Sequence, residues 1–263
     1  MSLNRLRDLY AEGRPAIGTF FSSGNEAMME CLGYTGLDFV VIDTEHGPFD
    51  TETMQSLIRV AEAGGLVPVV RIADVTHKEI QRAADAGAQG IIIPCLRSIE
   101  DFRKAVDLAK YTPLGNRGFI KGRGAGYGSA PWAGGSLEEY FAASNEKLMV
   151  IPQCETVEAL EQIEEIVTIE GLDGIFIGPF DLSTTMGIPG QFSAPELLAA
   201  EERVRKACDA AGKPCYILSM TPPEAAELLN AGYAGVAHNL DFGIFTKAYQ
   251  DEVRAIRAGL ADR

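Results

Sequence analysis

Short apolar segments alternate with segments of helical periodicity along the whole chain. Each apolar segment is nearly continuous, which is typical of strands buried on both faces of a parallel sheet. The eight predicted strands cover residues 16–21, 38–43, 67–72, 90–95, 148–153, 174–178, 215–219 and 235–239. Regular alternation of eight such strands with helices predicts an α/β fold, a closed (β/α)8 TIM barrel, rather than an open doubly wound sheet.

The segments between the strands carry signals for the start and end of helices. Asp50 can cap a helix whose apolar face repeats with helical spacing until Gly64. Thr76 and Glu79 have the spacing of a capping box at the start of the next helix. The C-terminal segment 246–263 is amphipathic, so it can pack on its own barrel or on a neighbouring chain.

One glycine-rich stretch, residues 112–137, breaks this rhythm and contains the single tryptophan. Because it follows the fourth predicted strand, we expect it at the catalytic rim as a mobile cover over a site. A flexible surface insertion without a role is the alternative.

Composition narrows the class of protein. A chain of 263 residues with 46% apolar residues can bury a substantial core, and we expect one domain over residues 1–263. The net charge of −14 argues against partners such as nucleic acid or an anionic membrane surface. Neither a signal-peptide core nor an apolar run of membrane-spanning length occurs, so we expect a cytoplasmic protein. Five cysteines without CxxC spacing fit a reducing compartment and mostly buried thiols.

In barrel enzymes the chemistry lies where the strands end, so the charged residues there are candidates. The second strand runs into Asp43-Thr44-Glu45-His46, and carboxylates beside an imidazole can raise its basicity and fix its tautomer. His46 is therefore a candidate catalytic residue. We expect His77 to be solvated in the first turn of a helix, and His238, in the eighth strand, could line the barrel mouth.

Arg71 interrupts the apolar third strand, where an unpaired guanidinium would be costly. A substrate carboxylate or a developing enolate would serve as its partner, and a structural ion pair is the alternative. Glu155 follows the fifth strand and Asp181 follows the sixth. Carboxylates at adjacent strand ends can share a divalent cation, and oxygen ligands favour Mg²⁺ or Mn²⁺. The alternative is that both residues only cap helices.

Lysine positions argue against imine chemistry. A Schiff-base aldolase needs a lysine in the barrel mouth, yet no predicted strand contains one. Lys147 precedes the fifth strand at the opposite rim, and Lys121 in the long loop is the remaining candidate. The segments after the last two strands lack the glycine-rich turns that usually bind phosphate in barrels.

These residues resemble those of the HpcH/HpaI aldolase family, the class II, metal-dependent pyruvate aldolases of the 4-hydroxy-2-oxoheptanedioate aldolase type. The resemblance extends over nearly the whole chain. The matching segments are GLDFVVIDTEHGPFD (36–50), PVVRI (68–72), QRAADAGAQGIIIP (81–94), PQCET (152–156) and GLDGIFIGPFDLS (171–183).

The resemblance implies a role for individual positions. It implies that His46 is the general base, acting through a bound water, with Asp85 as the acid that raises its basicity and Asp43 as a nearby carboxylate. By the same resemblance Arg71 steadies the enolate, Glu155 and Asp181 bind the metal, and Gln153 and Phe180 touch the oxoacid. Spacing alone would not select Asp85, because it lies near the end of a predicted helix.

The implied reaction is reversible aldol cleavage of a 4-hydroxy-2-oxoacid to pyruvate and an aldehyde. The implied cofactor is Mg²⁺ or Mn²⁺, with Co²⁺ as a further candidate, and the implied assembly is a homohexamer with exchanged C-terminal helices. Phe180 stands where relatives often have a small residue, and His238-Asn239 replaces a more usual small-residue end of the eighth strand. These departures leave the natural aldehyde open.

Two other functions stay open at this stage. The first is an oxaloacetate-type decarboxylase, or a lyase for acyl-CoA thioesters, that uses the same enolate. The second, of another class, is a non-catalytic barrel that binds an oxoacid.

Overall fold

The computed structural model describes residues 2–260, and its strands form a closed parallel barrel in the order β1 to β8. The strands are β1 (Ala16–Phe21), β2 (Phe39–Asp43), β3 (Val67–Arg71), β4 (Gly90–Ile93), β5 (Met149–Cys154), β6 (Ile175–Ile177), β7 (Cys215–Ser219) and β8 (Gly235–Leu240). All eight predicted strands are confirmed, with ends that differ by at most two residues. The predicted (β/α)8 architecture is therefore correct.

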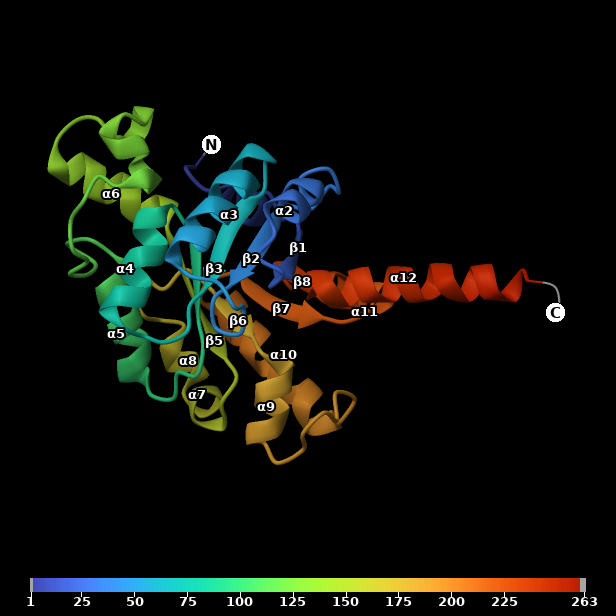
Figure 1. Cartoon of the computed structure of the whole chain (residues 1–263). Coiled ribbons are helices and arrows are strands. Elements are labelled where there is room, and N and C mark those ends of the chain that lie inside the picture. The colour runs from blue at the N-terminus through green and yellow to red at the C-terminus, as the bar shows by residue number, and fades with distance from the viewer. Residues whose placement is uncertain (1, 261–263) are drawn as a thin grey trace.

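Helices connect the strands and surround the barrel (Figure 1). They are α1 (Arg5–Ala11), α2 (Glu26–Leu32), α3 (Thr51–Ala63), α4 (His77–Ala86), α5 (Ile99–Ala109), α6 (Leu137–Lys147), α7 (Val157–Glu161), α8 (Ile163–Ile166), α9 (Pro179–Thr185), α10 (Pro195–Ala210), α11 (Pro222–Asn230) and α12 (Asp241–Ala258), with the 3-10 turns η1 (Arg123–Gly128) and η2 (Pro131–Ala133). No helix in the described part of the chain is both long and apolar enough to cross a membrane.

Two predicted helix starts can be compared with the structure. The Asp50 side chain accepts a hydrogen bond from the Thr53 N–H at 2.9 Å and caps α3 as predicted. Thr76 caps α4 by accepting from the Glu79 N–H at 3.3 Å, while the return bond from Glu79 is not among the hydrogen bonds of residues 2–260. The predicted capping box is therefore half formed.

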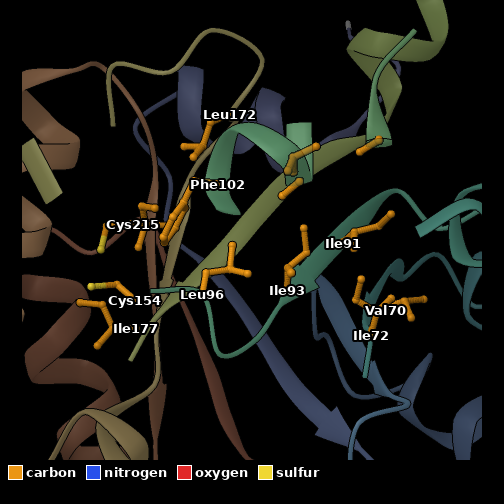
Figure 2. Packing of buried hydrophobic residues seen from close by; sticks show 14 of the residues in the cluster. Val70, Ile72, Ile91, Ile93, Leu96, Phe102, Cys154, Leu172, Ile177 and Cys215 are labelled. Atoms are coloured by element: carbon orange, nitrogen blue, oxygen red, sulfur yellow. The ribbon is translucent and has the colours of Figure 1, made fainter. Parts of the chain in front are cut away.

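The core has two layers because successive side chains of a strand point to opposite faces. On β3, Val67 and Val69 lie inside the barrel, whereas Val70 packs between the strands and the surrounding helices. Figure 2 shows part of this outer layer, to which strand residues such as Ile91 and helical residues such as Phe102 both belong. This alternation decides which polar residues at the strand ends point into the barrel.

The last helix departs from the usual barrel pattern. Helix α12 projects away from the barrel (Figure 1), and Asp241 at its start is the one residue of this helix that is buried in residues 241–258. Several of its large apolar side chains are exposed: Phe242, Ile244, Phe245, Tyr249, Val253 and Ile256. The space that a packed last helix would cover is an apolar groove of about 570 Å³ between α2 and α11, across β1 and β8.

Candidate active site

An ion pair between β2 and β3 forms the centre of the candidate site. Asp43 and Arg71 are register partners on these strands, and each lies two residues after an inward-pointing valine, Val41 and Val69 respectively. Arg71 donates from Nε to Asp43 Oδ1 at 2.9 Å and from one terminal nitrogen to Asp43 Oδ2 at 2.7 Å. The Phe20 ring lies 4.8 Å from the guanidinium carbon, within range of a cation–π contact. The structural ion pair that was the alternative for Arg71 is thus present.

The Asp43 carboxylate also shapes the turn that follows β2. Its Oδ1 accepts hydrogen bonds from the backbone N–H groups of Glu45 at 3.2 Å and His46 at 3.4 Å. Gly47 closes the turn by donating to the Asp43 carbonyl at 3.1 Å. A Cβ atom at Gly47 would lie 2.1 Å from that carbonyl oxygen, so this position requires glycine.

Glu45 lies between the arginine and the histidine. Its Oε2 lies 3.2 Å from a terminal nitrogen of Arg71 and 3.8 Å from Nε2 of His46. The Glu45 side chain is 17% exposed and that of His46 is 71% exposed. Burial raises the pKa of Glu45, while the charges of Arg71 and His46 lower it. Burial disfavours the charged form of Arg71, but its bonds to Asp43 and the charge of Glu45 raise its pKa overall.

Glu155 is buried directly after β5, with 2% of its surface exposed. Its Oε1 accepts from the Cys95 backbone N–H at 2.5 Å, and its Oε2 accepts from the Gln153 side-chain amide at 2.6 Å. Cys95 has a left-handed φ of 60°, which turns its N–H toward the carboxylate. Glu155 does not cap the following helix, because the N-cap of α7 is Thr156. The alternative role for Glu155 is therefore wrong.

Asp181 lies in the first turn of α9, which begins at the end of β6, and it is exposed at the same rim as Glu155. Burial is the main reason that the pKa of Glu155 is raised to about 7. The charges of Asp181 and Glu45 also raise it, while the Cys95 N–H and the charge of Arg71 lower it. A Cβ atom at Gly178 would lie 2.6 Å from Glu155 Oε2, so glycine at the end of β6 leaves room for this carboxylate.

The residues at this rim fit a divalent cation. Asp43, Glu45, Glu155 and Asp181 contribute four carboxylates, and Arg71 contributes one guanidinium. Carboxylate oxygens are the ligands that Mg²⁺ and Mn²⁺ prefer. Within residues 2–260 no group of three or more His, Cys, Asp or Glu side chains is arranged to hold a metal. A cation held by Glu155 and Asp181 would therefore keep positions for oxygen atoms of other molecules.

Gln153 and Phe180 flank these carboxylates. Gln153 points into the barrel, is 2% exposed, and its Oε1 has no hydrogen-bond partner among the described residues. A buried carbonyl oxygen without a partner is costly, which marks a place where a ligand or water is expected. Phe180 is 45% exposed and packs edge-on against Phe192, with ring centroids 4.6 Å apart.

Asp85 is not brought to this cluster within one chain. It lies near the end of α4, which runs from the catalytic rim to the opposite end of the barrel, and it pairs with Arg117 at 2.7 Å. The prediction that residues 112–137 cover the catalytic rim is also wrong, because the helix before this segment carries the chain away from that rim. Helix α5 follows β4 and returns the chain to the opposite end, where Arg123 donates to the Ala86 carbonyl at 3.0 Å (Figure 1).

The other histidines and the two lysines also have defined positions. His77 is exposed at the start of α4, as predicted. His238 faces outward, lines the apolar groove and contacts the Ser219 hydroxyl through Nδ1 at 3.2 Å, so it does not line the mouth. Lys121 and Lys147 both lie with the loop at the opposite end of the barrel, where they donate to the carbonyls of Ala133 and Gly124. Neither Lys121 nor Lys147 is therefore placed for imine chemistry at the catalytic rim.

Residues 16–248 match the family model described as HpcH/HpaI aldolase/citrate lyase. The chain belongs to this family. It is 32% identical to a 2-keto-3-deoxy-L-rhamnonate aldolase of Salmonella gallinarum over 97% of this chain and 94% of the relative. It is 32% identical to a 5-keto-4-deoxy-D-glucarate aldolase of Citrobacter koseri over 94% of each chain.

A solved HpcH/HpaI family structure from Burkholderia cenocepacia superposes with a TM-score of 0.88, at 29% identity and covering 97% of this chain and 99% of that one. The aldolase relatives show that this HpcH/HpaI chain is a carbon–carbon lyase of the aldolase type, acting on small molecules. This decides against the non-catalytic barrel.

Three neighbours of the predicted site residues in this HpcH/HpaI barrel received no role of their own from the sequence. Glu45 stands in the same motif as His46, and its spacing of two from Asp43 was an available signal for a shared direction. Phe20 and Cys95 gave no such signal, because their contacts to Arg71 and Glu155 depend on neighbouring strands and on a left-handed backbone.

Proposed function

We propose that this aldolase cleaves a 4-hydroxy-2-oxoacid to pyruvate and an aldehyde, and catalyses the reverse addition. The observation that carries the proposal is the buried Glu155 carboxylate, which lies close enough to Asp181 and Arg71 for both charges to act on its pKa. Such a cluster has an excess of negative charge that a divalent cation would partly neutralise, and the cation would in turn attract an anionic oxoacid.

Glu155 and Asp181 would hold the cation, with Mg²⁺ or Mn²⁺ favoured and Co²⁺ as a further candidate. When bound, a divalent cation supplies positive charge that favours the enolate over the keto form of the oxoacid. The Gln153 amide already holds Glu155 from one side, and its free Oε1 is available to orient a bound oxoacid or a water. Phe180 would bound the oxoacid pocket beside Asp181.

Arg71 would stabilise negative charge as it develops on the substrate oxygen. Its guanidinium is fixed by Asp43, Glu45 and Phe20 before any substrate binds. A group that is already oriented needs little reorganisation during the reaction, which is the basis of electrostatic catalysis.

His46 would act as the general base that takes the proton of the 4-hydroxyl, directly or through a water. Its imidazole is mostly exposed at the catalytic rim and can reach a substrate there. We retain Asp85 as its acidic partner, and this requires a second chain, because Asp85 of the same chain lies at the other end of the barrel.

We further propose a homo-oligomer, with six chains as the expected number, in which α12 of one chain packs in the groove of another. The exposed apolar face of α12 and the apolar groove between α2 and α11 belong to the same chain and are complementary in character. Five free cysteines support a reducing, cytoplasmic location.

Turnover of pyruvate with a panel of aldehydes, with and without chelator, tests the proposed reaction. We expect product formation that a chelator abolishes and that Mg²⁺ or Mn²⁺ restores. Full activity in thoroughly metal-stripped protein would overturn the metal assignment. Release of carbon dioxide from oxaloacetate without any aldol product would favour the decarboxylase instead, and activity toward acyl-CoA thioesters alone would favour the thioester lyase.

A further inference from the structure

Glu45 lies between Arg71 and His46, and the proposed reaction gives it no role. One carboxylate oxygen, Oε2, lies within ion-pair distance of both Arg71 and His46, at 3.2 Å and 3.8 Å. The other charged groups near Glu45 are Asp43 on β2, Asp181 on α9 and Glu155 after β5, and all three are negative. The Glu45 carboxylate thus lies between the Arg71 guanidinium and the His46 imidazole and can interact with both.

The His46 imidazole is held by little else. Its backbone N–H bonds to Asp43, but its ring is 71% exposed, and Glu45 is the charged side chain within ion-pair distance of that ring in residues 2–260. Arg71, in contrast, has the two bonds to Asp43 and would stay in place without Glu45. Loss of the Glu45 carboxylate should therefore affect His46 more than Arg71.

We infer that Glu45 is a positioning residue that orients His46 and stabilises the proton that His46 receives in the reaction, through a carboxylate that Arg71 holds in place. The inference rests on the proposed role of His46 as the general base. A base must stabilise the proton it receives, and a carboxylate beside the imidazole does so electrostatically. Because Arg71 anchors the same carboxylate, the base and the enolate-stabilising group keep a fixed relative position.

The test compares Glu45→Gln with wild type in the loaded enzyme, with Mn²⁺ and an aldehyde that wild type accepts. Glutamine keeps the shape but removes the charge. We expect kcat to fall about tenfold, and the acid limb of the kcat/KM profile to move to lower pH by about half to one unit. We expect the KM for pyruvate to change less than twofold to threefold, because Arg71 keeps Asp43.

Glu158→Gln is the matched control. Glu158 is also paired with an arginine, Arg97, in the helix after β5, and its loss changes the net charge equally without touching His46. We expect wild-type rates and an unshifted profile for this variant. A folded Glu45→Gln enzyme with an unshifted profile would overturn the inference, whether its rate is normal or reduced.

Glu45→Asp provides a second measurement if Glu45→Gln does not fold. It keeps the charge but cannot span both partners, so we expect lower kcat with the acid limb in place. Wild-type kcat in this variant would overturn the inference. Failure of the proposed function is a distinct result: His46→Ala would keep full activity, or the wild type would release no pyruvate.

Discussion

Replacement of Glu155 by glutamine separates two effects of this carboxylate: its proposed role in metal binding, and the decrease that its buried charge causes in the free energy of unfolding. Burial raises the pKa of Glu155 from the ordinary value of 4.5 to about 7 in the metal-free chain. A group with a higher pKa in the folded state favours folding less as the pH rises. The penalty is absent well below pH 4.5, grows between about pH 4.5 and 7, and is complete above pH 7.

The magnitude follows from that difference in pKa. At about 1.4 kcal/mol for each tenfold change, the ionised Glu155 lowers the free energy of unfolding by up to about 3 kcal/mol at pH 8. Glutamine carries no charge and can keep both contacts, because its carbonyl can accept from the Cys95 N–H while the Gln153 amide rotates to present its free oxygen. We therefore expect Glu155→Gln to be more stable than wild type at pH 8 and similar at pH 5.

The assay is urea unfolding of chelator-treated protein at pH 5 and pH 8, at one fixed protein concentration. Adding Mn²⁺ at a hundred times its dissociation constant should raise the stability of wild type by about 3 kcal/mol and leave Glu155→Gln unchanged. Catalytic activity should be lost in the variant.

Glu201→Gln is the matched control, because burial and the charge of Glu224 also raise the pKa of Glu201 to about 7. It lies on α10, outside the candidate site, so we expect a similar stabilisation at pH 8 with normal Mn²⁺ binding. If metal-free Glu155→Gln protein is less stable than wild type at pH 8, the ionised Glu155 does not lower the free energy of unfolding as proposed.

Three further substitutions or truncations test other parts of the proposal. Asp43→Asn should lower the free energy of unfolding in urea by about 3 kcal/mol, because it leaves the largely buried Arg71 without its main counter-charge, and an unchanged midpoint would contradict this. Arg71→Lys should lower kcat/KM about a hundredfold while the Mn²⁺ dissociation constant, measured by calorimetry, stays within about threefold. If metal binding is lost as well, Arg71 supports the ligands instead. Removal of residues 244–263 should yield monomers in analytical ultracentrifugation, since it deletes most of the exposed apolar face of α12, and an intact oligomer would show that another surface holds the chains together.

The sequence alone was sufficient to predict the barrel and most of the rim. Alternation of apolar strands and helices is a local pattern, and it located all eight strands. Position at a strand end was likewise enough to select Arg71 and Glu155, because parallel strands all end at one face. The segment 112–137 was assigned to the wrong end because the returning helix α5 was not counted between it and β4.

Only the tertiary structure decided which of these groups meet. The contact of Glu155 with the Cys95 N–H depends on a left-handed residue in the loop that follows the neighbouring strand β4, which no local pattern reveals. The separation of Asp85 from His46 depends on the direction of α4 across the barrel. Sequence patterns reflect periodic burial, whereas pairing between distant residues depends on strand register and chain direction, which follow from the packing of the whole barrel.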